Sequence, residues 1–418
     1  MWHSAQKNRN VQRLFLLCWA VYFTSYLGRM NFSALMSEIM DAGILTAAGA
    51  GAVNMAYLLA YGIGQLVNGL LGDRVRPGRM IFIGLLTAGV CNFCMAAART
   101  GAWMVLFWCG NGYAQSMLWP PIMRLFAEEL PPERRVRASV DIVSSMALGS
   151  LASYLVSAAA LQRGAPAAAF WLPAAALCLM ACIWHLCIRR IARRAAPAPQ
   201  QAARARQQSL LPALPAACLL LLFPVMVHGG LKDGLTGWIP TYFHERFAVS
   251  ASFSAMVTML LPIVNLSGAY MAEWANRRLH GSEIRAAGVF FGAAAAALGA
   301  LELAGRYSLI LSLLLFAAIT SSMLAVNALF INLLPLRFAG QGRVATISGA
   351  LNAIAYLGSA ACTGVMGLLL DRLGWSLVMG GWIALTAAAW VVCLGCARLP
   401  FAKEAPPQGG QKERTDLE

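Results

Sequence analysis

The chain has 418 residues, of which 59% are hydrophobic and only 12% charged, and its mean hydropathy of +0.64 exceeds that expected for soluble domains. A formal net charge of +15 would suggest a nucleic-acid partner in a soluble protein. Here the hydropathy excludes water as the main solvent, so we expect a lipid bilayer as partner and no nucleic acid.

Stretches of about 20 mostly apolar residues, long enough to cross a ~30 Å hydrocarbon core as helix, recur from end to end. They predict twelve transmembrane helices near residues 13–34, 47–71, 80–98, 102–126, 138–161, 167–188, 211–243, 251–273, 285–304, 307–333, 344–369 and 375–397. Gly, Ala, Ser and Thr are plentiful in these stretches, as closely packed membrane helices require. The sequence therefore predicts an all-α membrane protein.

Basic residues lie mostly on one side of the predicted membrane. The termini and every second connection hold the basic runs at 74–79, 134–137, 189–206 and 277–285. The other connections hold only Arg99, Arg163, Arg246, Arg306 and Arg372. By the positive-inside rule, both termini are expected in the cytoplasm, with the chain crossing the cell (inner) membrane many times.

A polar stretch rich in Arg, Ala, Pro and Gln at 189–210 predicts a flexible cytoplasmic linker. It separates an N-terminal bundle of six helices (1–188) from a C-terminal bundle of six (211–400), and a disordered cytoplasmic tail is expected at 401–418. Leu148-Gly149-Ser150 and Leu357-Gly358-Ser359 repeat between the halves. Two pseudo-symmetric bundles of this kind place a substrate site at their interface.

The loop after the second span combines glycine, an acid and several arginines. Gly69 permits close helix approach, and Asp73 can accept hydrogen bonds from a helix N-terminus or pair with Arg74 and Arg79. This spacing resembles the signature between spans two and three of the major facilitator superfamily, which implies a gating role. A solvated basic turn that only fixes topology would account for the arginines but not for the Gly–Asp spacing.

Three further cations lie inside predicted spans. Arg29 lies sixteen residues beyond Arg13, and Lys232 lies about as far into the seventh span. A cation at the centre of a span costs about 2.5–3.5 kcal/mol on insertion scales, which marks a functional site. Two cations that face one cavity repel each other unless an anion lies between them. Arg124, near the cytoplasmic end of the fourth span, could equally extend its charge to the membrane surface.

An ion pair with Asp233 is the competing explanation for a buried charge at Lys232. Adjacent residues on an α-helix, however, point about 100° apart and do not face each other. Tyr22 and Tyr26 lie on the helical face of Arg29. Other aromatic side chains could add hydroxyl or indole donors, although each taken singly also suits packing. They are Tyr57, Tyr61, Trp119 and Tyr356.

Five segments are informative together: residues 26–32, 61–79, 232–242, Trp119-Pro120-Pro121 with Arg124, and Ala355-Tyr356-Leu357-Gly358 followed by Asp371 and Gly374-Trp375. They resemble the organophosphate:phosphate antiporter family, which includes glycerol-phosphate and hexose-phosphate carriers. In that family, paired arginines in spans one and seven clamp the substrate phosphate. The resemblance implies that role for Arg29 and Lys232. It also implies substrate-binding roles for Tyr22, Tyr26, Tyr61, Tyr356 and Trp119.

The chain departs from the phosphate carriers at two positions. Gln65 stands where they have a lysine, and Met146 stands where they have a histidine. The expected ligand is therefore a small organic anion, which could be an organophosphate, a carboxylate or a monoanionic phosphodiester.

The expected function is secondary active transport by alternating access, with exchange for inorganic phosphate as one mode. A non-transporting sensor of the same fold and a proton-coupled exporter that uses Asp141 or Asp233 are the alternatives. No enzyme motif, cofactor site or metal site is expected, because nucleophile spacing, a phosphate-binding Gly loop and metal-ligand clusters are missing. A monomer is expected.

Overall fold

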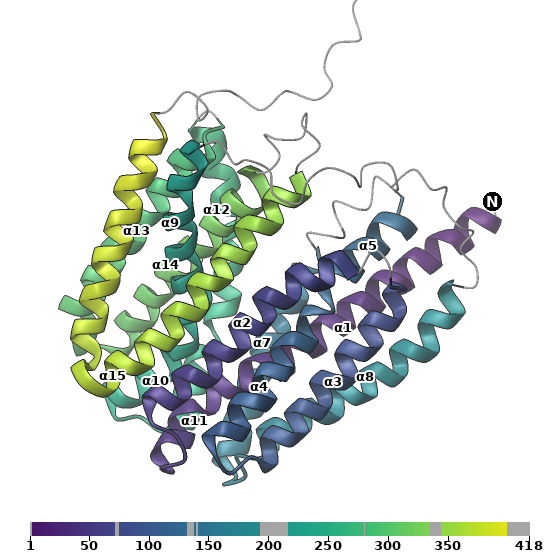
Figure 1. Ribbon diagram of the computed structural model, residues 1–418, viewed down its shortest axis with the longest axis horizontal. Coiled ribbons are helices and arrows are strands. Elements are labelled where there is room, and N and C mark those ends of the chain that lie inside the picture. The colour runs from purple at the N-terminus through teal and green to yellow at the C-terminus, as the bar shows by residue number, and fades with distance from the viewer. Residues whose placement is uncertain are drawn as a thin grey trace, which may run out of the picture.

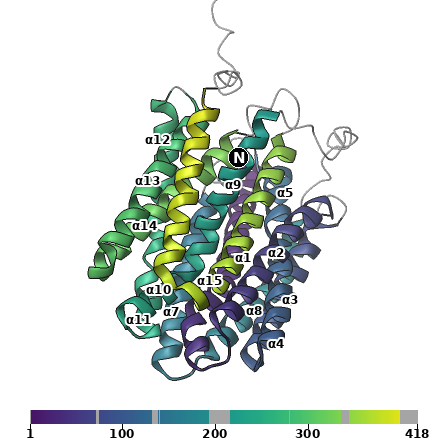
Figure 2. The ribbon, with the colours of Figure 1, turned by 60° about the vertical axis from the view of Figure 1, so that its left-hand side comes forward.

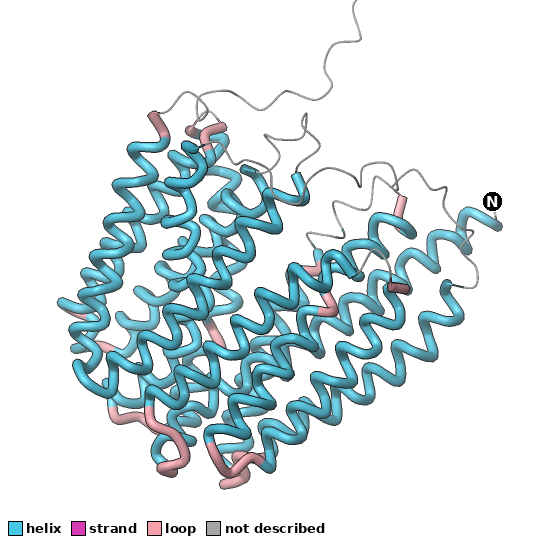
Figure 3. Tube along the Cα trace, in the orientation of Figure 1, coloured by secondary structure: helices cyan, strands magenta, loops and turns pink. Residues whose placement is uncertain are grey.

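The computed structural model describes residues 2–71, 75–131, 138, 141–192, 216–279, 281–334 and 344–398. Within these ranges the chain consists of helices and short connections (Figure 3). The helices form two groups that lie side by side, one drawn in purple, blue and teal and the other in teal, green and yellow (Figure 1). We call the end of the molecule with the N-terminus the N-terminal face and the opposite end the distal face.

Seven helices make up the first group. They are α1 (Trp2–Asp41), α2 (Ala47–Leu71), α3 (Pro77–Ala97), α4 (Gly101–Ser116), α5 (Trp119–Glu129), α7 (Val143–Gln162) and α8 (Ala168–Ala192). Connections at 42–46, 98–100 and 163–167 lie at the distal face, where α1 ends.

The second group has more irregular elements. They are α9 (Ala216–Gly229), the π-helix η2 (Gly230–Leu235), the 3₁₀ turn η3 (Thr236–Trp238), α10 (Ile239–Phe247), α11 (Ala251–Thr258), α12 (Leu261–Arg278), α13 (Glu283–Leu303), η4 (Gly305–Tyr307), α14 (Leu309–Asn327), η5 (Ala328–Leu333) and α15 (Val344–Cys396). In the turned view of Figure 2, α12, α13 and α14 lie at the left and α2, α3 and α4 of the first group lie at the right.

Helix pairing repeats between the groups. In the first group α1 packs on α7, α2 on α4, and α3 on α8. In the second group α9 packs on α15, α12 on α14, and α13 on α15. The predicted pair of pseudo-symmetric six-helix bundles is therefore confirmed.

Among the described residues, nine helices are long and apolar enough to cross a membrane. One of them is α15, whose 53 residues suffice for two crossings and bend at Gly374 (φ 71°). The other two predicted crossings are α1, which carries Arg29, and the pair α4 and α5, each too short alone to span a bilayer. The twelve predicted spans are thus accounted for.

Proline explains where the structure divides spans that the sequence predicts as single helices. Pro120 and Pro121 stand at the start of α5, Pro240 at the start of α10 and Pro262 at the start of α12. Since proline has no N–H to donate to the preceding turn, the α-helical ladder is interrupted there. Spans four, seven and eight are consequently each built from more than one segment.

The predicted linker and tail lie largely outside the described residues. Helix α8 runs on to Ala192, four residues into the stretch assigned to the linker, while 193–215 and 399–418 are not described. The domain bounds remain a prediction.

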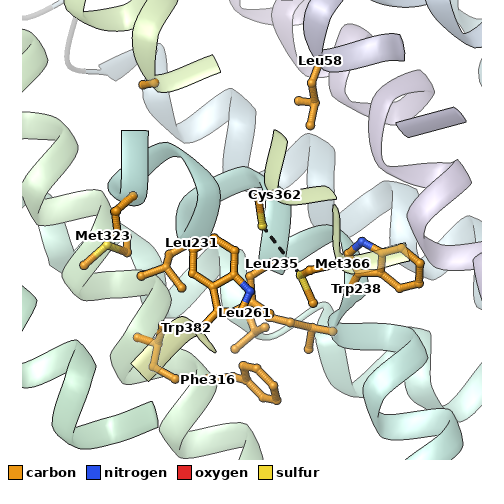
Figure 4. Packing of buried hydrophobic residues seen from close by; sticks show 14 of the residues in the cluster. Leu58, Leu231, Leu235, Trp238, Leu261, Phe316, Met323, Cys362, Met366 and Trp382 are labelled. Carbon is orange, nitrogen blue, oxygen red and sulfur yellow. Dashed lines mark hydrogen bonds between the residues drawn. The ribbon is translucent and has the colours of Figure 1, made fainter. Parts of the chain in front are cut away.

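A continuous cluster of buried apolar side chains joins the two groups. It contains Phe32 and Trp108 of the first group and Leu231, Phe316 and Trp382 of the second. Figure 4 shows part of it, with Leu231, Leu235 and Trp238 from the seventh span and Cys362, Met366 and Trp382 from α15. The segment that carries Lys232 is therefore held on its apolar side by α15.

Candidate functional site

Arg29 lies beside a break in α1. Gly28 has non-helical dihedrals (φ −94°, ψ 18°), and the next residue, Arg29, is only 7% exposed. Its guanidinium carbon lies 4.5 Å from the ring centroid of Tyr61, 5.2 Å from that of Tyr26 and 5.7 Å from that of Tyr57. Arg29 forms no ion pair or hydrogen bond with another described residue.

Three aromatic rings only partly offset the free-energy cost of burying this charge. A cation over an aromatic ring gains about 0.5–2 kcal/mol. The N–H groups of the guanidinium remain donors without acceptors within the described part of the chain, and these donors suit an anion bound in one plane.

Side-chain amides from α3 and α4 stabilise the break at Gly28. Asn92, Asn111 and Gln115 donate to the Gly28 carbonyl at 3.2, 2.9 and 3.2 Å. The N–H of Phe32, four residues after Gly28, donates to the Asn31 side chain at 3.2 Å. The backbone polar groups freed by the break are thus satisfied, which fixes the direction in which Arg29 leaves the helix.

This amide cluster was not expected from the sequence. Its members, together with Asn31, are buried, and Asn31 donates to Asn92 at 2.9 Å. Buried amides at helical positions indicate some polar network, but only the fold shows that they meet at one carbonyl.

Lys232 lies in η2, and its ammonium is 2.5 Å from Asp233 Oδ2. The argument that these neighbours cannot face each other is therefore wrong. It assumed an α-helix, whereas residues 230–235 form a π-helix, in which successive side chains are separated by a smaller rotation. Both side chains remain about one-fifth exposed, at 19% and 22%.

Glycines allow η2 and α15 to pack backbone against backbone. A Cβ on Gly229 would lie 1.9 Å from the Ala355 carbonyl oxygen, and one on Gly234 would lie 2.9 Å from that of Ser359. The Ser359 hydroxyl donates to the Gly229 carbonyl at 2.8 Å, and that of Thr363 donates to the Gly234 carbonyl at 3.2 Å. This contact brings the Tyr356 ring to 5.7 Å from the Lys232 ammonium.

Arg29 and Lys232 occupy equivalent places in the two halves. A Cβ on Gly149 would meet the carbonyl oxygen of Phe23 at 2.5 Å, and one on Gly358 would meet that of Met226 at 2.1 Å. Phe23 and Met226 each precede the cation of their half by six residues. The repeated Leu-Gly-Ser motif therefore marks the same helix contact twice.

The aromatic residues expected at the site form a connected series. Tyr22 contacts Tyr26 with ring centroids 5.4 Å apart and Trp119 with centroids 4.9 Å apart. Tyr61 contacts Tyr356 across the boundary between the groups, at 4.8 Å. Tyr57, which also contacts Arg29, belongs with this set.

Gln65 and Met146 are half-buried. Gln65 lies one helical turn beyond Tyr61 on α2, on the same face. No hydrogen bond joins its side chain to either cation among the described residues. Met146 packs against the apolar cluster around Val21 and Trp184.

The residues expected to gate the N-terminal face are only partly visible. Arg124 donates to the Val75 carbonyl at 3.3 Å, which links α5 to the connection after α2. Arg79 is exposed in the first turn of α3, and Gly69 lies within α2. Asp73 and Arg74 lie outside the described residues.

Contacts between the halves at the distal face were missed by sequence reasoning. The Asp371 carboxylate accepts hydrogen bonds from the Ala47 and Ala48 N–H groups, at 3.1 and 2.9 Å, at the start of α2. His244 Nε2 lies 2.8 Å from Asp41 Oδ2. A carboxylate at a helix N-terminus is favourable, so Asp371 joins the two groups at this face.

Comparison with known proteins identifies relatives of the whole chain and of parts of it. The family model described as Major Facilitator Superfamily matches residues 18–363. A glycerol-3-phosphate transporter of Bacillus subtilis is 24% identical over 92% of this chain and 91% of its own length.

Shorter matches are somewhat more similar. A probable hexose phosphate transport protein of Chlamydia trachomatis is 32% identical over 27% of this chain and 25% of its own length. The membrane sensor protein UhpC of Salmonella typhimurium is 30% identical over 27% of this chain and 26% of its own length. These two alignments thus span only about a quarter of each relative.

The fold matches that of a solved transporter. A bacterial homolog of the human lysosomal transporter Spinster, in an inward-facing and occupied conformation, superposes with a TM-score of 0.78. The match covers 94% of this chain and 98% of that chain at 14% sequence identity, so it speaks for the fold alone.

Proposed function

We propose that this chain carries a small organic anion bound between Arg29 and Lys232. The chain belongs to the Major Facilitator Superfamily and is a multi-pass membrane transporter rather than an enzyme. The observation that supports the proposal best is the buried guanidinium of Arg29, whose N–H donors have no acceptor among the described residues. Leaving such a cation unpaired in a membrane span is costly, and a bound anion supplies the missing partner.

The position of the cations suggests how binding is coupled to movement. Arg29 belongs to the first half and Lys232 to the second, and the Tyr61 ring beside Arg29 contacts the Tyr356 ring beside Lys232. An anion that contacts both cations draws the halves together, and it favours whichever state lets it make both contacts. Tyr22, Tyr26 and Trp119 extend the site toward the N-terminal face, with Gln65 on the wall formed by α2.

We assign the N-terminal face to the cytoplasm of the cell, since the basic connections lie there. The substrate class that best fits the relatives is an organophosphate or a related anion, exchanged for inorganic phosphate. Lys232 in place of a second arginine provides a point charge rather than a planar pair of donors.

The test is uptake into proteoliposomes loaded with inorganic phosphate, measured with labelled phosphate and glycerol 3-phosphate outside at about pH 5, where both are mostly singly charged because the second phosphate pKa is about 6. Arg29→Gln should abolish exchange, while Arg99→Gln, which removes an exposed charge in the α3–α4 connection, should leave it unchanged. Exchange at the wild-type rate in Arg29→Gln would refute the assignment.

A sensor that binds the anion without carrying it is the second candidate, because one relative is a membrane sensor protein. Binding of phosphate or glycerol 3-phosphate that depends on Arg29, in vesicles that show no counterflow, would favour this candidate over transport.

A further inference from the structure

The net positive charge of the site is smaller than two unpaired cations would give. Arg29 has no ionic partner among the described residues, whereas the Lys232 ammonium lies 2.5 Å from an Asp233 carboxylate oxygen. Asp233 also lies within electrostatic range of Arg29. The charges of Arg29, Lys232 and Asp233 sum to one positive charge.

A carboxylate inside an anion site changes which anions can enter. Because Asp233 already pairs with Lys232, a second negative charge on the ligand finds no unpaired cation to offset the loss of its own hydration. Because Coulomb energies between near neighbours at partly buried sites reach several kcal/mol, one fixed carboxylate can decide between ligands that differ by one charge.

Asp233 is held in place by the fold. It lies in η2. Gly229 at the end of α9 and Gly234 in η2 contact α15 through their backbones, and their carbonyls accept hydrogen bonds from the Ser359 and Thr363 hydroxyls. Thr236 donates to the Lys232 carbonyl at 2.6 Å, which fixes the same turn from its other end. The carboxylate thus belongs to a rigid wall of the site.

We propose that Asp233 is a specificity-determining residue that restricts the site to singly charged anions, such as phosphodiesters or monocarboxylates, and disfavours phosphate monoesters in their dianionic form. This inference rests on the proposed function, since it names the charge class of the anion bound between Arg29 and Lys232. The tyrosine hydroxyls around Arg29 suit the neutral, hydroxyl-bearing part of such a ligand.

The experiment measures binding to the purified full chain by calorimetry with two matched pairs of probes. Dimethyl phosphate and methyl phosphate have similar shapes but differ by one charge at about pH 8, above the second phosphate pKa of about 6. Lactate and succinate form the corresponding carboxylate pair, and the two pairs together distinguish a phosphodiester ligand from a carboxylate.

Wild-type protein should bind the monoanion of at least one pair about tenfold or more tightly than its dianion. Asp233→Asn, which keeps the side-chain shape and an oxygen acceptor for Lys232, should abolish or reverse that preference. Asp233→Glu should retain it, which shows that charge rather than folding is responsible. Glu273→Gln removes an exposed carboxylate that pairs with Arg277, and it should leave the preference unchanged.

Tighter binding of methyl phosphate and succinate to the wild type would overturn the inference, and so would an unchanged preference in Asp233→Asn. Either result would leave the proposed anion site intact. If none of the four probes bound to either the wild type or Asp233→Asn, that result would instead refute the proposed function, and the inference with it.

Discussion

Tyr61 and Tyr356 pack ring against ring across the boundary between the two halves, with centroids 4.8 Å apart. The first ring lies under the Arg29 guanidinium and the second lies beside the Lys232 ammonium. The two cations are therefore connected through an aromatic contact that must change whenever the halves rock apart. Ligand binding and the relative position of the halves share the same residues.

Replacing Tyr61 by leucine should weaken anion binding by about 2-fold to 30-fold, since it removes the aromatic face closest to Arg29. Tyr61→Phe keeps the ring and should have a smaller effect. Calorimetric titration with the tightest-binding probe would measure both. Equal losses in the two variants would show that the hydroxyl, not the ring, is what the ligand needs.

Asn111→Leu should reduce both stability and anion affinity. It removes a donor to the Gly28 carbonyl and an acceptor for Asn92 and Gln115, so buried amides lose partners at a cost of about 1–3 kcal/mol. Thermal unfolding and titration report the two effects. Thr258→Val, which removes a buried hydroxyl bonded within α11, should lower stability without changing affinity. Wild-type affinity in Asn111→Leu would contradict a positioning role for the amide cluster.

Gly358→Ala should disrupt the second half, because its Cβ would lie 2.1 Å from the Met226 carbonyl oxygen and force α9 away from α15. The expected result is loss of transport together with a lower unfolding temperature. Gly299→Ala provides the matched control, since nothing lies within 4 Å of its Cβ. In a helix interior that change should be neutral or stabilise by up to about 1 kcal/mol.

Asp371→Asn should weaken closure at the distal face, since a charged acceptor at the N-terminus of α2 is worth about 0.5–2 kcal/mol. Spin labels at Ala42→Cys and Ala248→Cys, in a background without native cysteines, would report the separation of the halves. The population with longer distances should grow. Glu245→Gln, whose carboxylate bonds Trp375 within one half, is the control. An unchanged distance distribution in Asp371→Asn would argue against a closing role.

Much of the fold follows from the sequence because apolar stretches and arginine placement depend only on the bilayer as solvent. The span positions and the doubled Leu-Gly-Ser motif needed no tertiary information. The break at Gly28 could not be found in this way, since Gly28 occurs inside an apolar stretch and bends only because amides from α3 and α4 reach its carbonyl.

The same reason explains the error about Lys232 and Asp233. Their pairing depends on a π-helical turn, and that turn is stabilised by hydroxyl groups of α15 more than 120 residues away in sequence. The role of Asp371 was equally unpredictable, because its carboxylate can accept these hydrogen bonds only when α15 lies against the start of α2. Contacts that follow regular α-helical spacing were predictable, whereas contacts that depend on a redirected or altered helical turn were not.

The most direct test of the central claim is where an anion binds. A structure of the full chain with dimethylarsinate, a singly charged and electron-dense probe, would locate arsenic by its anomalous scattering. We predict one site between the Arg29 guanidinium and the Lys232 ammonium, within hydrogen-bond distance of both, and its loss in Arg29→Gln. A bound probe elsewhere that persists in Arg29→Gln, with no density between the two cations, would contradict it.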